Sequence, residues 1–137
     1  MKTIAAVEEE IIEEMNFFDD PMERYEYIIE QGKLLSEMNP DFKTDDFLVK
    51  GCQSKVWLRA LKDGDQLSFE ADSNTAITKG IVALLLRVLN HRTADEILNA
   101  HLTFIEKTNL REHLSSQRAN GLSAMILKIR NYANALL

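Results

Sequence analysis

Apolar side chains at the start of the chain recur every three or four positions, which is the spacing of one face of an α-helix. The first such segment runs from Ile4 to Met15 and carries acidic residues on its opposite face. A second helix is expected from Pro21 to about Met38, because Asp20 is a suitable N-cap and proline suits the first helical position. Pro40 ends this segment, since a residue before proline is driven out of the helical region.

The middle of the chain changes to the two-residue alternation of a β-strand. Residues 56–60 and 67–71 each place apolar side chains at alternate positions, and Asp63-Gly64 between them is a turn signal. The pattern therefore predicts a hairpin with one apolar face. A short strand at Phe47 to Val49 is expected to pair with this hairpin, because a lone hairpin is only marginally stable in water.

Helical spacing returns after the turn-forming residues 72–74. One helix is predicted over residues 77–88, and a short one follows the capping-box pair Thr93 and Glu96. A last helix is expected to begin at Ser115 or at the serine after it. Helices at both ends of the chain around a small three-stranded antiparallel sheet make an α+β fold.

The size and composition of the chain are typical of one globular domain, with 137 residues of which 45% are hydrophobic and 28% charged. We expect a single domain over residues 1–137, because no repeat, linker or low-complexity tract interrupts the pattern. No apolar run approaches the roughly 20 residues that cross a bilayer, so no membrane span is expected. The glutamate-rich N-terminus is unlike a secretory signal or a transit peptide, and the expected location is therefore cytoplasmic.

Charge and cysteine content narrow the classes of partner. The formal net charge is -6 and the basic residues are scattered, whereas a nucleic-acid binder concentrates lysine and arginine against phosphates. Nucleic acid is therefore not an expected partner. The single cysteine, Cys52, excludes a disulfide within the chain and a thiolate-rich metal site, so no metal centre is expected. Any chemistry at Cys52 involves this thiol alone or another molecule.

The surroundings of Cys52 leave two interpretations open. A lone cysteine is commonly a small buried hydrophobic side chain. Here, however, it lies between two predicted strands, directly after Gly51, in a loop where a packed thiol has little use. Lys50, Lys55 and Arg59 add positive charge that would favour the reactive thiolate, although such lysines also commonly solvate a strand edge.

The three histidines, His91, His101 and His113, each lie at or near a predicted helix boundary. None has the spacing of a metal site, and capping or surface polarity explains them simply. A histidine base for Cys52 stays possible from sequence, because such partners meet only in the fold. A cysteine-nucleophile thiol enzyme is therefore the alternative function. Arg118 would lie in the first turn of the last helix, where the helix dipole disfavours a cation, which is a weak indication of another task.

The chain resembles the SufE family, whose members accept sulfur from cysteine desulfurases for iron–sulfur cluster assembly. The most specific match is the string Gly51-Cys52-Gln53-Ser54-Lys55-Val56-Trp57-Leu58. Weaker blocks at residues 23–33, 71–80 and 113–122 agree in order and spacing, so that the resemblance covers nearly the whole chain. The positions that depart from the usual family pattern are Phe47, Lys50, Asn74 and Gln117.

The resemblance implies a function and a site. Cys52 matches the cysteine that accepts sulfur as a persulfide, Arg118 matches an arginine near the desulfurase interface, and Gly51 and Gln53 match the mobile loop. Pyridoxal phosphate is expected on the partner desulfurase only, so this chain would need no cofactor. By accepting sulfur, the protein would stimulate that desulfurase, of the SufS type, and it would then pass the sulfur to a scaffold of the SufBCD type.

The same resemblance favours an accessory sulfur-transfer protein over a stand-alone enzyme. It also implies the fold shared with IscU-type scaffolds, but those hold iron with several cysteines, and one cysteine makes a scaffold role a poor fit. The sequence leaves open whether the protein is a monomer or a homodimer, which desulfurase it meets, and whether Cys52 is buried at rest.

Overall fold

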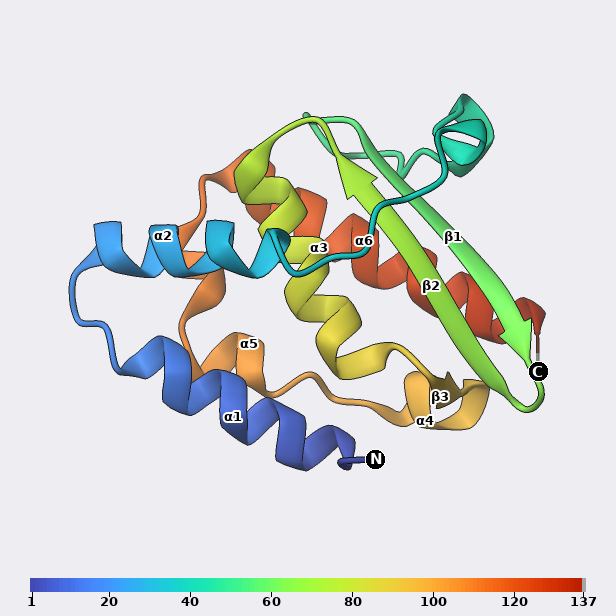
Figure 1. Cartoon of the computed structure of the whole chain (residues 1–137). Coiled ribbons are helices and arrows are strands. Elements are labelled where there is room, and N and C mark those ends of the chain that lie inside the picture. The colour runs from blue at the N-terminus through green and yellow to red at the C-terminus, as the bar shows by residue number, and fades with distance from the viewer. Residues whose placement is uncertain (137) are drawn as a thin grey trace.

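The computed structural model describes residues 1–136 and confirms an α+β fold, with helices packed around a three-stranded antiparallel sheet (Figure 1). The α-helices and strands, in chain order, are α1 (Ile4–Asn16), α2 (Pro21–Gly32), β1 (Val56–Asp63), β2 (Gln66–Ser73), α3 (Ala76–Leu89), β3 (Arg92–Thr93), α4 (Ala94–Asn99), α5 (Phe104–Lys107) and α6 (Ser116–Ala135). Short 3-10 helices are η1 (Pro40–Phe42), η2 (Asp45–Phe47) and η3 (Leu110–His113). No helix within residues 1–136 is both long and apolar enough to span a membrane.

The core forms where the apolar face of the hairpin meets α3 and α6. Strands β1 and β2 pair along their whole length, and Leu58 lies opposite Ala71. Their inward side chains are buried against α3, which lies at the centre of the molecule and also contacts α1, α2 and α6 (Figure 1). The Tyr132 hydroxyl on α6 donates to the Leu58 carbonyl oxygen at 2.9 Å. The predicted helices α1, α3, α4 and α6 are confirmed, and Ser115 is the N-cap of α6.

Helix α2 ends at Gly32, and the prediction that it continues to about Met38 is wrong. Gly32 packs on α3, where a Cβ at this position would lie 3.0 Å from the Gly80 backbone nitrogen. Beyond this crossing the chain turns away from the helix axis, which leaves Leu34 77% exposed and buries Met38. Met38 is therefore apolar because it packs on the core, and not because the helix continues to it.

The third strand is also not at Phe47 to Val49, where a partner for the hairpin was expected. Residues Asp45–Phe47 form η2, and Leu48 makes only a single bridge with Trp57. The third strand is β3, which pairs with β2 through Gln66 and Leu67. A two-residue strand is too short to produce a recognisable alternation.

An ionic cluster fastens the N-terminal helix to the centre. The Arg87 guanidinium on α3 donates to both carboxylate oxygens of Glu14 on α1, at 2.8 and 2.7 Å, and the Tyr27 hydroxyl on α2 donates to the same carboxylate at 2.9 Å. The hydrogen bonds from Arg87 hold the pKa of Glu14 below its ordinary value, although burial opposes this shift. Three helices are therefore held together at one carboxylate.

Candidate functional site

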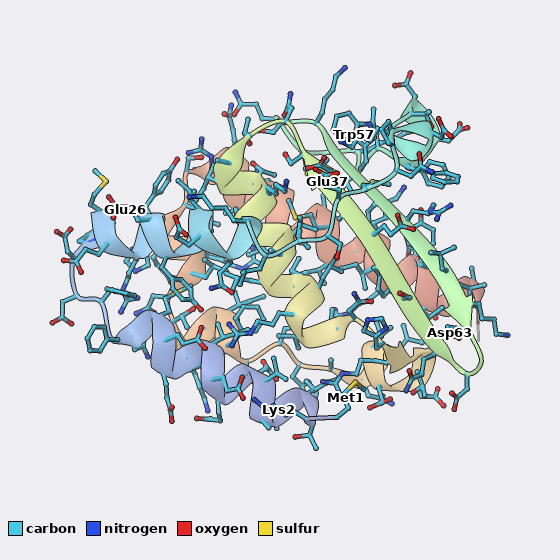
Figure 2. The ribbon with its side chains drawn as sticks, in the orientation of Figure 1. Met1, Lys2, Glu26, Glu37, Trp57 and Asp63 are labelled. Carbon is cyan, nitrogen blue, oxygen red and sulfur yellow. The ribbon has the colours of Figure 1, made fainter. Side chains whose placement is uncertain are left out.

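Cys52 lies in the loop that leads into β1, at the end of the hairpin where Trp57 projects in Figure 2, opposite the end marked by Asp63. The Val49 amide donates to the Val56 carbonyl oxygen at 2.8 Å and closes the base of this loop. Gly51 has a φ of 95°, a left-handed conformation that glycine adopts without strain. This turn directs the Cys52 side chain onto α6.

The thiol packs on a glycine of α6. Cys52 Sγ donates to the Gly121 carbonyl oxygen at 3.6 Å, and a Cβ at Gly121 would lie only 3.3 Å from the same sulfur. A Cβ at Gly51 would likewise lie 3.4 Å from the Ala124 side chain, one helical turn further along. Glycine inside a helix costs up to about 1 kcal/mol relative to alanine, so its presence here indicates a packing requirement. That requirement is room for the thiol.

The second half of the loop is fixed to the junction of β2 and α3. The Lys55 amide donates to Asn74 Oδ1 at 3.0 Å, and the Ser73 hydroxyl donates to the Lys55 carbonyl oxygen at 2.8 Å. The Thr75 hydroxyl donates to Ser54 Oγ at 3.0 Å. The loop is therefore anchored at its base and at residues 54–55, while its tip is held through the thiol.

A small pocket surrounds the thiol, and three of the predicted site residues meet there. Cys52, Gln53 and Arg118 share its lining with Gly121, and Gly51 adjoins them in the chain. Its volume of about 10 Å³ has room for no more than one water molecule. A pocket of this size holds no organic substrate, although the Cys52 side chain itself is only half-buried.

The charge environment of the thiol differs from the prediction that nearby cations favour the thiolate. Burial raises the pKa of the Cys52 thiol. Arg59 lies elsewhere, because its guanidinium pairs with Glu70 at 2.5 Å and stacks over the Phe42 ring at 3.5 Å. The resting thiol is therefore protonated at neutral pH, which agrees with its role as hydrogen-bond donor.

Arg118 is the half-buried cation of this pocket. Its backbone amide donates to the N-cap Ser115 hydroxyl at 3.2 Å, which fixes the residue in the first turn of α6. Among the residues that the structure describes, no carboxylate lies within 4 Å of its guanidinium. Its charge is thus available to a group that approaches from outside.

The histidines lie away from the thiol. His113 Nε2 is 3.1 Å from Arg24 Nη1, and His101 lines a different pocket, beside Arg130. His91, with a φ of 58°, makes the turn from α3 into β3. None of these three histidines, all within the described residues, lines the Cys52 pocket, so the resting structure gives no support to a histidine base. Within residues 1–136, no three His, Cys, Asp or Glu side chains are grouped as a metal site would need.

Sequence reasoning did not assign a role to Gly121, nor to the hydroxyl pair of Ser54 and Thr75. A glycine six residues into a helix was the available signal, since an interior glycine that is not a cap commonly has a packing reason. The hydrogen bond between Ser54 and Thr75 could not be predicted from the sequence, because serine and threonine are common near turns.

Comparison with protein families gives one match over most of the chain. The SufE model, described as an Fe-S metabolism associated domain, matches residues 9–133. An uncharacterized SufE-like protein of Rhizobium meliloti (strain 1021) is 41% identical over 134 residues, which cover 94% of this chain and 96% of that protein. A second uncharacterized SufE-like protein, from Rhizobium etli, is 42% identical over 131 residues, covering 91% of this chain and 88% of its own.

A plant relative and a solved structure extend the comparison. SufE-like protein 1, chloroplastic/mitochondrial, of Arabidopsis thaliana is 37% identical over 119 residues, which cover 86% of this chain and 32% of the plant protein. The solution structure of a hypothetical protein from Thermus thermophilus has a TM-score of 0.77 and covers 95% of both chains at 17% identity. This structural likeness supports the fold alone.

Proposed function

We propose, from the premise that this chain belongs to the SufE family and so has a role in iron–sulfur metabolism, that Cys52 accepts sulfur from a cysteine desulfurase and carries it to a scaffold. The observation that carries this proposal is a single half-buried thiol in a loop, held by one weak hydrogen bond and with no substrate-sized pocket beside it. A carrier needs a thiol that travels into its partner, whereas a self-contained enzyme needs a substrate site around it.

The proposed step is an exchange between two cysteines. The Cys52 thiolate attacks the outer sulfur of the desulfurase persulfide, and a new S–S bond forms at Cys52. The S–S bond of the donor breaks, and its cysteine leaves as a thiolate that takes up the proton lost from Cys52. One sulfur atom has moved, no net oxidation has occurred, and no further reactant is required.

The resting contact with α6 suits the idle state of such a carrier. A thiol whose pKa is raised by burial reacts slowly with oxidants and alkylating agents, because the thiolate is the reactive form. Release of the loop exposes the thiol to water and removes the cause of the raised pKa. A lone cysteine also protects the cargo, since a second thiol nearby could attack the persulfide and close a disulfide.

The other predicted residues belong to the surface around this thiol. We propose that Gly51 and Gln53 move with Cys52 and that Arg118 contacts the desulfurase, because its guanidinium is free of carboxylate partners in the described residues. We further propose that pyridoxal phosphate stays on the desulfurase, that loading stimulates that enzyme, and that exchange takes place in the cytoplasm. The plant relative, by contrast, is named for chloroplast and mitochondrion.

The test is the intact mass of the protein after incubation with a cysteine desulfurase and free cysteine. We expect a gain of one sulfur, about 32 Da, that a reductant reverses. The Cys52→Ser variant is the matched control and should gain nothing. An unchanged wild-type mass, with a desulfurase from the same organism that is active towards cysteine, would refute sulfur acceptance.

A further inference from the structure

A shallow groove of about 450 Å³ lies at the turn between α1 and α2 and shares no lining residue with the Cys52 pocket. Its lining is aromatic apart from two carboxylates of α1, and consists of Phe17, Phe18, Tyr27, Glu13 and Glu14. The Phe17 side chain is 79% exposed, although phenylalanine is among the residues most often buried. An exposed aromatic surface that forms a groove is typical of an interaction site.

The three aromatic rings of the groove form one continuous surface. Phe17 meets Phe18 edge to face with ring centroids 5.3 Å apart, and the centroid of Phe18 lies 6.1 Å from that of Tyr27. Arg24 holds the turn beneath them, because its guanidinium donates to the Phe18 carbonyl oxygen at 2.7 Å and to the Thr108 carbonyl oxygen at 2.8 Å. The exposed Phe17 ring therefore stands on a turn that is fixed to the rest of the molecule.

The two helices that form the groove hold the negative charge of the chain. Residues 1–30 include ten acidic and only two basic side chains, whereas the rest of the sequence includes twelve acidic and fourteen basic ones. Glu14 binds Arg87, but no basic side chain in the part of the chain that the structure describes lies within 4 Å of Glu13. Glu26, exposed on α2 at the same end of the molecule (Figure 2), has no such partner either. The aromatic surface is therefore bordered by uncompensated negative charge.

We propose that this groove binds a segment of another protein in which an arginine or lysine side chain lies beside an apolar one. The cation stacks on the exposed Phe17 ring, whose face attracts positive charge, and it pairs with Glu13. The apolar neighbour covers the rest of the aromatic surface. The acidic excess on α1 and α2 attracts a basic surface and repels nucleic acid and anionic membranes, so a basic protein segment is the occupant. This interaction is separate from the proposed sulfur transfer and does not depend on it.

The experiment is an NMR titration of the full-length protein with a short peptide, blocked at both ends, in which arginines alternate with leucines. We expect saturable shifts of the backbone amides of residues 13–27, with a dissociation constant of about 1 mM or below. The same peptide with citrulline, the neutral isostere of arginine, should bind at least about fivefold more weakly. Phe17→Ser and Glu13→Gln should each weaken binding of the arginine peptide by about fivefold, because they remove the ring and the charge separately.

Two substitutions away from the groove are the matched controls. Leu34→Ser changes another apolar side chain, 77% exposed, and Asp63→Asn removes an exposed carboxylate at the opposite end of the molecule (Figure 2). Both should leave the affinity for the peptide within about twofold. Equal binding of the arginine and citrulline peptides, or no saturable shift at the groove with about 10 mM peptide, would overturn the inference. A dimer that Phe17→Ser converts to a monomer in sedimentation would also overturn it, because the occupant would then be a second copy of the chain.

Discussion

Two glycines inside helices of this protein make close contacts of opposite character. Gly80 on α3 faces the backbone of α2, and a Cβ there would lie 1.9 Å from the Ile28 carbonyl oxygen. Gly121 on α6 faces the end of a side chain, and a Cβ there would lie 3.3 Å from Cys52 Sγ. The first contact joins two packed helices, whereas the second joins a helix to a loop anchored mainly at its ends.

This difference separates a rigid contact of the framework from a weak contact of the loop. A backbone-to-backbone contact has no flexible atom that can yield, so any change at the crossing of α2 and α3 requires the two helices themselves to move. The contact of the thiol with Gly121 consists of one weak sulfur hydrogen bond and van der Waals contact, both of which are lost at small cost. The same residue type therefore fixes the fold at one site and leaves the reactive group releasable at the other.

The largest effect is expected for Gly80→Ala. The added methyl group requires α2 and α3 to move apart, which should destabilise the protein by at least about 3 kcal/mol and lower its melting temperature by roughly 10 °C. Thermal and urea unfolding measure this loss. An alanine variant as stable as wild type would show that the two helices are not locked at this contact.

Gly121→Ala should change stability by less than about 1 kcal/mol, because the gain in helix propensity offsets the crowding of a flexible side chain. The thiol should be displaced from α6 and should react several-fold faster with an alkylating agent. Asn120→Ala, at the exposed neighbouring position, is the control and should react at the wild-type rate. An unaltered alkylation rate in Gly121→Ala would contradict the docked position of the thiol.

The pH dependence of alkylation sharpens the same comparison. Because burial raises the pKa of the Cys52 thiol, the wild-type rate should rise with pH through a midpoint above that of an exposed cysteine. In Gly121→Ala the midpoint should fall towards the ordinary value, since the displaced thiol is solvated. Identical midpoints in the two proteins would show that burial does not set the thiolate population.

Asp72 lies at the end of β2, beside the junction to which the second half of the loop is fixed. Burial by itself raises the pKa of Asp72, but hydrogen bonds from Lys43 and from the Ser73 amide, with the charge of Lys79, outweigh it and hold the pKa below its ordinary value. This carboxylate therefore stabilises the fold above the pKa of the unfolded chain, and the contribution is lost as pH falls through the folded-state pKa.

We expect Asp72→Asn to lower the free energy of unfolding by about 1 kcal/mol at neutral pH, as measured by urea unfolding. The difference in unfolding free energy between the variant and the wild type should disappear in acid, where Asp72 is protonated. A gap that is independent of pH would mean that packing, and not charge, is what the substitution removes.

The features that could be predicted from the sequence are those that rest on a periodic pattern over many residues or on a specific motif. Helices α1, α3 and α6 and the hairpin follow from spacing over many residues, and the loop that carries Cys52 follows from its octapeptide. The end of α2 at Gly32 could not be predicted, because it depends on a contact with Gly80, far along the chain. The burial of the thiol against Gly121 could not be predicted either, because this contact also joins residues that are far apart in the chain.

The transfer of labelled sulfur tests the central claim most directly. A desulfurase charged with labelled cysteine would be mixed with the wild-type protein or with Cys52→Ser, and the label on each would be counted after separation without reductant. The account predicts label on the wild type alone, released by reductant. Label retained equally by Cys52→Ser, or absent from both while the desulfurase is charged, would contradict it.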